Sequence, residues 1–190
     1  MEENVETEEV KDTFLKDVLT MILYFLVVVF LSFLVVHFIG QRTQVSGKSM
    51  EPTLYHGDNL IVDKITYQFN APTRYDIIVF PYEGDKEIYY IKRIIGLPGE
   101  KIQLVSNEIY INDKLLDEDY GKEPMFLNTE GIAKEAIILG DDEYFVLGDN
   151  RNHSSDSRDP DVGIIKKDSI IGRAWLRVWP FKRVGILKHQ

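Results

Sequence analysis

The sequence predicts a mostly β fold: an antiparallel sheet or barrel-like domain, preceded by one N-terminal transmembrane helix. Residues 18–39 contain no Asp, Glu, Lys or Arg. After residue 40, short apolar runs alternate with turn residues, and no helical periodicity persists. We therefore divide the chain into an acidic tail at 1–16, a transmembrane helix at 17–40 and a β-rich domain at 41–190.

The segment ahead of the apolar run is strongly acidic. Such a charge-rich stretch buries little apolar surface, so we expect a solvated and disordered tail. Lys11 interrupts a series of carboxylates. These are Glu2, Glu3, Glu6, Glu8, Glu9 and Asp12.

The apolar run at 18–39 has the length of a transmembrane helix, because about 20 helical residues rise about 30 Å. A cleavable signal peptide would have a basic start and a shorter apolar run. A buried core helix is rarely apolar on every side over this length. Lys11 and Lys16 before the run balance Arg42 and Lys48 after it, so the positive-inside rule leaves its orientation open.

The composition excludes several classes of protein. The formal net charge is -9, which argues against a broad basic surface and therefore against nucleic acid as a partner. The chain has no cysteine, so thiol proteases, disulfide frameworks and thiolate metal sites are excluded. The sequence makes no prediction of oligomeric state.

The β-rich domain is predicted from short apolar runs bounded by Gly, Pro, Asn and Asp. Residues 107–113 have the pattern of one arm of a hairpin, and the polar, aperiodic residues 120–136 are expected to form a long loop. Together these runs indicate a barrel or two packed sheets. We expect strands at 59–65, 76–80, 88–95, 101–105, 108–111, 143–147 and 170–178.

Ser49 is a candidate nucleophile because it lies in a glycine-containing loop. Such a loop exposes the hydroxyl and lets backbone N–H groups approach a developing oxyanion. Taken alone, this pattern also fits an ordinary turn serine. The Gly-Lys-Ser triplet at 47–49 occurs in phosphate-binding loops too, but Arg42 replaces the glycine needed there and Pro52 opposes an immediate helix.

Lys92 is a candidate general base. In a strand, Lys92 and Arg93 point to opposite faces, so one of them faces inward or into a cleft. Burial lowers the pKa of a lysine and frees its amine to accept a proton, whereas an arginine stays protonated. A serine nucleophile needs such a base nearby. The alternative is an exposed charge pair at a sheet edge.

Residues 148–158 form a segment dense in polar side chains. A calcium loop is one interpretation, but the segment lacks the central glycine and the terminal Glu of an EF-hand. The other interpretation is a supporting shell, in which Ser154 and Asp156 hold Lys92 and Arg158 in place.

Several segments, taken in order, carry a resemblance to a known family. They are SMEPTL at 49–54, GD at 57–58, DIIVF at 76–80, YIKRIIGLPGE at 90–100 and GDNR…SSDSR at 148–158. In this order they resemble the type I signal peptidases, the Ser/Lys proteases that remove signal peptides from exported proteins. The short length and single span are similar to the compact Gram-positive enzymes.

The resemblance implies a role for each matching residue. Ser49 would be the nucleophile that forms an acyl-enzyme, and Lys92 its general base. Ser154 would hydrogen-bond to Lys92 and orient it. Asp156 and Arg158 would form a supporting ion pair.

The resemblance also implies an oxyanion hole and pockets for small side chains. The backbone N–H of Ser49 would be one oxyanion donor. Gly47 departs from the pattern, because some family members have a serine hydroxyl there as a second donor. The positions that match the pocket walls, which are equally plausible as core residues, are Met50, Leu54, Val79 and Ile91.

A cytoplasmic N-terminus and an extracytoplasmic catalytic domain follow from the resemblance, with a single pass through the cell membrane. Secretory preproteins and the lipid bilayer would be the partners. The family needs no metal and no organic cofactor.

Three rival interpretations remain. His153 or His56 could act as the base in a Ser-His-Asp arrangement. A related peptidase with another exported substrate, such as a pilin-processing enzyme, would share the Ser/Lys pair. The chain could also be a membrane-tethered binding module with an inactive site.

Overall fold

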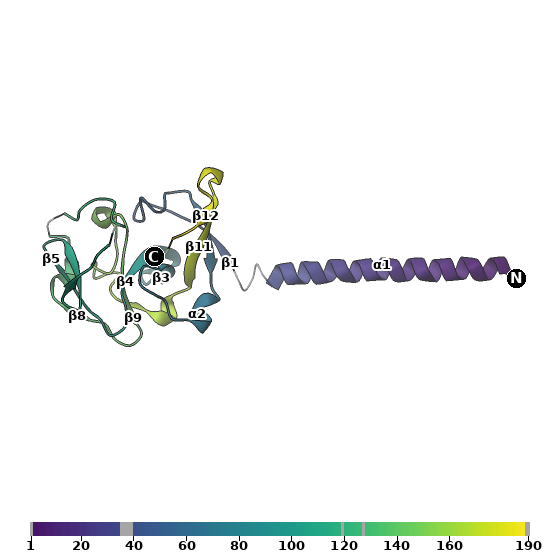
Figure 1. Cartoon of the computed structure of the whole chain (residues 1–190), viewed down its shortest axis with the longest axis horizontal. Helices are drawn as coiled ribbons and strands as arrows, with labels where there is room; N and C mark the ends of the chain where they lie inside the picture. The colour runs from purple at the N-terminus through teal and green to yellow at the C-terminus, as the bar shows by residue number, and fades with distance from the viewer. Residues whose placement is uncertain (1, 35–39, 119, 127, 189–190) are drawn as a thin grey trace. The chain divides into compact units, whose positions relative to one another are not determined.

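The computed structural model describes residues 2–34, 40–118, 120–126 and 128–188. The chain divides into two compact units, Met1–Gly40 and Gln41–Gln190. Figure 1 shows a single helix in the first unit and a β-rich second unit. Each unit is described by itself below.

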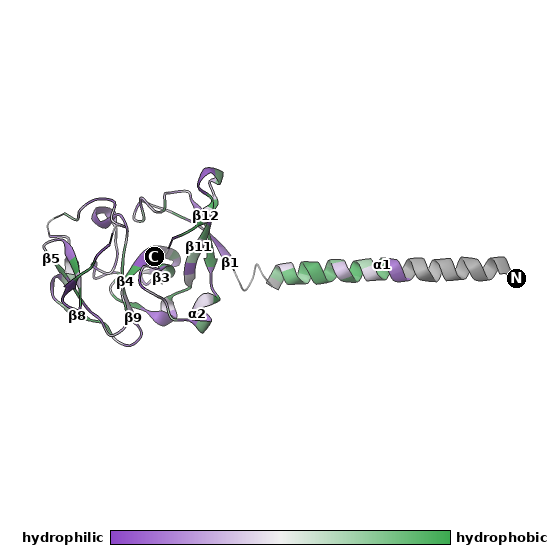
Figure 2. Cartoon of the chain, in the orientation of Figure 1, coloured by the Kyte–Doolittle hydropathy of each residue, from purple (hydrophilic) through white to green (hydrophobic). Residues whose placement is uncertain are grey.

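Helix α1 spans Glu2–Leu34. Its segment Lys16–Phe33 has a mean hydropathy of 2.0 and none of it is buried, so it is long enough and apolar enough to cross a membrane. The apolar residues of this segment are drawn in green in Figure 2. The expected boundary of the transmembrane helix at residue 40 follows residues 35–39, which lie outside the described part.

The acidic segment 2–16 is helical in the structure and not the disordered tail that we expected. Nucleation is the costly step in helix formation, and the apolar segment that follows already supplies the nucleus. Glutamate and lysine, which are frequent in this segment, both have high helix propensity. The helix therefore extends toward the N-terminus.

The larger sheet of the second unit has eight strands, and residues far apart in the chain are neighbours in it. Its order is β1-β2-β11-β3-β4-β9-β10, with β12 paired to β11. The central pairs β3–β4, β4–β9 and β11–β2 are antiparallel. The strands are β1 (Gly40–Gln44), β2 (Asn59–Asp63), β3 (Ile77–Tyr82), β4 (Asp85–Gly96), β9 (Glu143–Leu147), β10 (Ile165–Lys166), β11 (Gly172–Trp179) and β12 (Gly185–Ile186).

The smaller sheet has four strands in the order β7-β6-β5-β8, also antiparallel. Figure 1 shows β5 and β8 on one side of the unit and β11, β12 and β1 on the other. The prediction of a mostly β, antiparallel fold is confirmed. The strands are β5 (Lys101–Val105), β6 (Glu108–Ile111), β7 (Lys114–Leu115) and β8 (Ile137–Ile138).

Three clusters of buried apolar side chains hold these sheets. The first lies among β2, β3, β4 and the loop after β1, and includes Met50, Leu54 and Ile91. The second joins the smaller sheet to Phe145 and Leu147 of β9. The third covers the face of β3, β4 and β9 that carries Phe80, Ile94 and Val146. Strand β4 contributes to all three clusters and is thus the centre of the unit.

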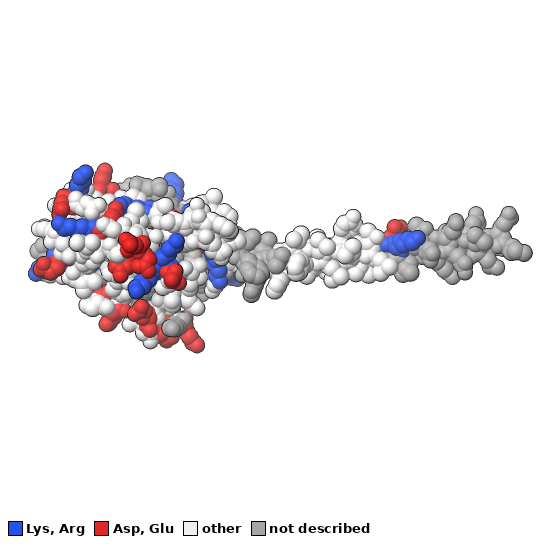
Figure 3. All heavy atoms as spheres, turned by 90° about the horizontal axis from the view of Figure 1, so that it is seen from below, with Lys and Arg blue, Asp and Glu red and all other residues white. Residues whose placement is uncertain are grey.

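The surface and loops of the unit carry most of its charge. Figure 3 shows acidic and basic side chains interspersed on one face of the β-rich unit. The expected long loop at 120–136 contains a 3-10 turn, Gly131–Lys134, and no strand among its described residues. A short helix, α2 (Thr66–Phe69), lies between β2 and β3.

Candidate active site

The loop that carries Ser49 is closed at its base by two backbone hydrogen bonds. Val45 N–H donates to the Asp58 carbonyl over 2.8 Å, and Gly57 N–H donates to the Val45 carbonyl over 2.9 Å. Within the loop, Gly47 has a φ of 90°, a conformation that side chains rarely adopt. The loop conformation therefore favours glycine at position 47.

Lys92 lies in the middle of β4, opposite Ile78 of β3. Its Nζ lies 2.8 Å from Ser49 Oγ, within hydrogen-bond distance. Arg93 points to the other face of the strand and pairs with Asp149. Lys92 is 4% exposed and Arg93 is 1% exposed, so the alternative of an exposed charge pair at a sheet edge is wrong.

The environment of Lys92 lowers the pKa of its amine relative to a lysine in water. Lys92 shares its strand face with Tyr90 and Ile94, which belong to the third apolar cluster. Burial there lowers the pKa of Lys92 from its ordinary value of 10.5 to about 8, although the charges of Asp156 and Asp149 raise it. At mildly alkaline pH, a large share of the molecules therefore carries an amine that can accept a proton.

The Tyr90 ring forms one wall beside Lys92, with its centroid 5.0 Å from Nζ. Tyr82 stacks on Tyr90 at 5.1 Å between ring centroids, and Phe80 meets Tyr90 edge-on. The Tyr90 ring, packed against these two rings, therefore covers one side of the amine.

Strand β9 pairs with β4, so the residues directly after β9 lie beside Lys92. The first of these is Gly148. A Cβ atom placed on Gly148 would overlap Ser154 Oγ and the Ser49 carbonyl oxygen. Gly148 thus permits Ser154 and the nucleophile loop to approach each other closely.

Ser154 does not make the hydrogen bond to Lys92 that we expected. Its Oγ is buried and has no hydrogen-bond partner among the described residues. The Lys92 amine is bonded to Ser49 instead. Ser154 still lies next to Gly148, and so close to the Ser49 backbone.

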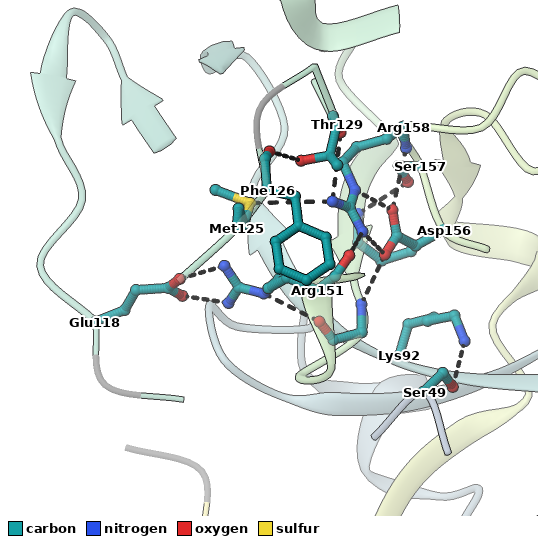
Figure 4. A network of polar contacts seen from close by, with 12 residues as sticks. Ser49, Lys92, Glu118, Met125, Phe126, Thr129, Arg151, Asp156, Ser157 and Arg158 are labelled. Atoms are coloured by element: carbon teal, nitrogen blue, oxygen red, sulfur yellow. Dashed lines mark hydrogen bonds and ion pairs between the residues drawn. The ribbon is translucent and has the colours of Figure 1, made fainter. Parts of the chain in front are cut away.

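Asp156 and Arg158 form a buried two-pronged ion pair. Arg158 Nε donates to Asp156 Oδ1 over 2.8 Å, and Arg158 Nη2 donates to Oδ2 over 2.9 Å. Asp156 Oδ2 also accepts the Gly148 N–H over 3.0 Å. Arg158 continues the network to the Arg151 carbonyl, as Figure 4 shows. The ion pair thus fixes the backbone at Gly148 and does not touch Ser49 Oγ.

A cleft of about 620 Å³ opens over Ser49 and Lys92. Met50 and Ile91 are part of its wall and also belong to the first apolar cluster. Leu54 and Val79 do not line the cleft, because they are packed in that cluster and are 0% and 2% exposed. The cleft is lined by residues 43–50, 88–92, His153 and Ser155.

Neither of the two histidines in the described residues, His56 and His153, is placed as a base for Ser49. His56 Nδ1 accepts a hydrogen bond from the Gly47 N–H over 3.3 Å, and His153 lines the cleft. Neither forms a hydrogen bond to Ser49 in the described part of the chain. Within the same residues, no group of three His, Asp or Glu side chains is arranged to hold a metal ion.

Sequence reasoning missed two residues of this site. Gly148 and Asn150 were assigned to a polar loop, without individual roles. The signal that could have found them is the Gly-Asp-Asn run that directly follows a predicted strand. Asn150 contacts the nucleophile loop directly, because its N–H donates to the Ser49 carbonyl over 2.9 Å.

A serine hydroxyl paired with a buried lysine amine, on an antiparallel β scaffold with an open cleft, defines a serine peptidase of the Ser/Lys type. The family described as "Signal peptidase, peptidase S26" matches residues 18–179. The chain therefore belongs to this family, and its activity is that of a type I signal peptidase, a serine hydrolase.

Two curated relatives agree with this assignment. The signal peptidase I of Leptolyngbya laminosa is 41% identical over 157 residues, which cover 79% of this chain and 74% of that protein. The signal peptidase I of Bacillus caldolyticus is 40% identical, over 77% of this chain and 83% of that protein. A crystal structure of a signal peptidase I from Enterococcus faecalis V583 is 35% identical, with a TM-score of 0.45, and covers 55% of this chain and 97% of that one.

Proposed function

We propose that this peptidase cleaves N-terminal signal peptides from secretory preproteins, with Ser49 as the nucleophile and Lys92 as the general base. The observation that carries the proposal is the 2.8 Å contact between Lys92 Nζ and Ser49 Oγ. It joins an amine of lowered pKa to a hydroxyl that lines an open cleft.

The pair supports a two-stage acyl transfer. The neutral Lys92 amine takes the Ser49 proton while Oγ attacks the scissile carbonyl carbon, whose oxygen becomes negatively charged. When the tetrahedral intermediate collapses, the peptide C–N bond breaks and Lys92 gives its proton to the leaving amine. Lys92 then takes a proton from a water molecule as that water attacks the ester carbonyl carbon. When this second intermediate collapses, the bond from the carbon to Ser49 Oγ breaks and Lys92 returns the proton to Oγ.

The oxyanion would be stabilised chiefly by the backbone N–H of Ser49. Gly47 brings no hydroxyl, and its own N–H is directed to His56 Nδ1. One well-placed oxyanion donor is worth about 3 kcal/mol of transition-state stabilisation. The orientation of the Ser49 N–H is therefore decisive for this enzyme.

Supporting roles are proposed for Ser154, Asp156 and Arg158. The ion pair holds Gly148, and Gly148 lies against both Ser154 and the Ser49 backbone. Ser154 has a buried hydroxyl without a partner among the described residues, which leaves it free to turn toward the Lys92 ammonium that forms during catalysis. Hydrogen bonds of this kind often tighten only when substrate is bound.

The substrate would present small apolar side chains to the cleft. Met50 and Ile91 form apolar wall there, while Leu54 and Val79 support that wall from the core. A pocket built from rigid core residues accepts small side chains more readily than large ones. This matches a substrate class selected by small residues before the cut.

We further propose that α1 anchors the enzyme in the cell membrane in a single pass, with the N-terminus cytoplasmic and the β-rich unit outside. A surface near the C-terminus supports contact between that unit and the lipid bilayer. Trp179, Phe181 and Val184 are exposed there, beside Lys182 and Arg183. Aromatic and basic side chains together are typical of membrane interfaces.

The proposal is tested by preprotein cleavage with the purified full chain in detergent. We expect wild type to release the signal peptide, and Ser49→Ala and Lys92→Ala to lose cleavage while remaining folded. His153→Ala and His56→Ala should retain it. An active Lys92→Ala variant together with an inactive His153→Ala variant would overturn the Ser/Lys assignment.

A folded wild-type chain that cleaves no preprotein would instead favour the membrane-tethered binding module. Sequencing of the released fragments separates signal peptides from other exported substrates, such as pilins.

A further inference from the structure

Asn150 holds two consecutive carbonyl groups of the nucleophile loop. Its Nδ2 donates to the Lys48 carbonyl oxygen over 3.1 Å, and its backbone N–H donates to the Ser49 carbonyl oxygen over 2.9 Å. Asn150 is 1% exposed and follows β9 closely in the chain. The nucleophile loop is therefore tied to the residue after the end of β9 through the carbonyl groups on both sides of the Ser49 Cα.

The bond from Asn150 Nδ2 sets the direction of the Ser49 N–H. In a planar trans peptide, the carbonyl of one residue and the N–H of the next point in opposite directions. With the Lys48 carbonyl held toward Asn150, the Ser49 N–H points away from Asn150. That N–H donates no hydrogen bond to any other described residue, so it is available to an oxyanion.

A rotated peptide would be harmful in two ways. It would remove the Ser49 N–H donor, and it would turn the Lys48 carbonyl oxygen toward the developing negative charge. The Glu51 N–H also donates to this carbonyl, over 3.1 Å. Glu51 belongs to the same loop and moves with it, whereas Asn150 lies outside the loop, after β9.

We infer that Asn150 is a positioning residue that fixes the Lys48–Ser49 peptide plane, and with it the oxyanion donor of Ser49. The inference rests on the function proposed above. It assigns Asn150 no contact with the substrate and no direct action on Lys92.

The cost of burying Asn150 supports a role beyond packing. Its Oδ1 is buried without a hydrogen-bond partner among the described residues. A buried acceptor without a partner costs about 1–3 kcal/mol, which an apolar side chain of the same size would avoid. The bond from Nδ2 to the Lys48 carbonyl is the contact that only the amide supplies.

The test replaces Asn150 in the full chain, with Asn150→Ala and the equal-sized Asn150→Asp as variants. Both remove the Nδ2 donor. We expect kcat for preprotein cleavage to fall about 100-fold, as a small misplacement of a catalytic group does, with KM nearly unchanged. In Asn150→Ala, which adds no charge near Lys92, the pH at half-maximal activity should stay at its wild-type value.

Asn152→Ala is the matched control. Asn152 lies in the 3-10 turn Arg151–His153, which directly follows Asn150, but its side chain binds Glu123, Pro124 and the Phe126 N–H. This variant should cleave with wild-type kcat. Circular dichroism melting curves confirm that each variant is folded before its kinetics are compared.

A pair of inhibitors separates a positioning role from a general loss of structure. When Ser49 Oγ adds to the carbonyl carbon of a peptide aldehyde, Lys92 takes the Ser49 proton and the π electrons move to the carbonyl oxygen. That oxygen becomes an oxyanion, and no group leaves. The same peptide ending in an amide binds without this step. The Asn150 variants should bind the aldehyde about 100-fold more weakly and the amide as wild type does.

Three results would overturn the inference: wild-type kcat in folded Asn150→Asp, equal weakening of both inhibitors, or a shifted pH midpoint in Asn150→Ala. The last would mean that Asn150 acts through Lys92. Failure of the proposed function looks different, because then wild type and Asn152→Ala would also leave the preprotein uncut.

Discussion

Lys92 Nζ and Ser49 Oγ lie 2.8 Å apart, although the two residues are separated by 43 positions in the chain. The nucleophile stands on a loop after β1, and the base stands on the central strand β4. The order of the strands in the sheet therefore brings the nucleophile and the base together, and burial of Lys92 within the unit lowers its pKa.

The pH dependence of cleavage follows from the lowered pKa of Lys92. Only the neutral amine accepts the Ser49 proton, and burial brings the pKa of Lys92 to about 8. We expect kcat/KM to rise about tenfold per pH unit below that value and to level off above it. His153→Ala should leave the midpoint in place. A flat profile from neutral to alkaline pH would contradict the assignment of Lys92 as base.

Lys92→Met should stabilise the protein while it abolishes activity. The folded protein holds the proton of Lys92 less tightly than the unfolded chain, with a pKa of about 8 instead of 10.5. The difference corresponds to about 3 kcal/mol of destabilisation, present in full below pH 8 and lost as pH rises to 10.5. Melting temperatures of the two proteins should therefore differ at pH 7 and converge at high pH. A less stable variant at pH 7 would show that burial of Lys92 costs little.

Gly148→Ala should abolish cleavage with moderate loss of stability. The added methyl group would overlap Ser154 Oγ and the Ser49 carbonyl oxygen, so the nucleophile loop must shift. Overpacking of this kind costs about 1–3 kcal/mol. Gly185→Ala is the control, because a Cβ there meets nothing within 4 Å. Full activity in a folded Gly148→Ala variant would show that the nucleophile loop can shift without loss of catalysis.

The Asp156–Arg158 pair is expected to act on stability more than on chemistry. Arg158 is 6% exposed and Asp156 is 0% exposed, so either single change leaves a buried charge without its partner. Asp156→Asn and Arg158→Met should each lower the free energy of unfolding by about 3–5 kcal/mol. The double variant should lose less than the sum of the two. Strict additivity in urea unfolding would argue against direct coupling.

The exposed tryptophans report on contact with lipid. The chain has two, Trp175 and Trp179, and Trp179 packs edge-on against Phe181. In Trp175→Phe, the remaining fluorescence of the reconstituted enzyme should be quenched by brominated lipids, because Trp179 would lie at the interface. Trp179→Phe with Trp175 intact is the comparison. If brominated lipids quench the Trp179 fluorescence no more than detergent without brominated lipid does, the β-rich unit does not contact the bilayer surface.

The longer strands of the fold could be predicted from sequence, because each combines β-branched residues with turn residues at its ends. The predictions at 101–105, 108–111 and 143–147 coincide with β5, β6 and β9. The polar strand β1 was not predicted, and neither were the short strands β7, β8, β10 and β12. A strand of two residues is too short to show an alternating pattern. It forms only because it pairs with the edge of a longer strand.

The candidate site was predictable in its residues and less so in its geometry. Burial of Lys92 follows from alternation along β4, once the sheet covers both faces of the strand. The absent bond between Ser154 and Lys92 depends on side-chain rotation, which no pattern in the sequence encodes. Residues 2–16 are helical because they extend the helix of the apolar segment that follows. Their composition, taken alone, predicted disorder.

Met50 and Ile91 have a dual position, with one side in the cleft and the other in the first apolar cluster. A mutation that enlarged the pocket would also open a cavity in the core, at a cost of about 2–5 kcal/mol. A variant with a larger pocket would therefore need a stabilising substitution elsewhere before it could accept a wider range of cleavage sites. The proposed preference for small residues is thus coupled to the stability of the fold.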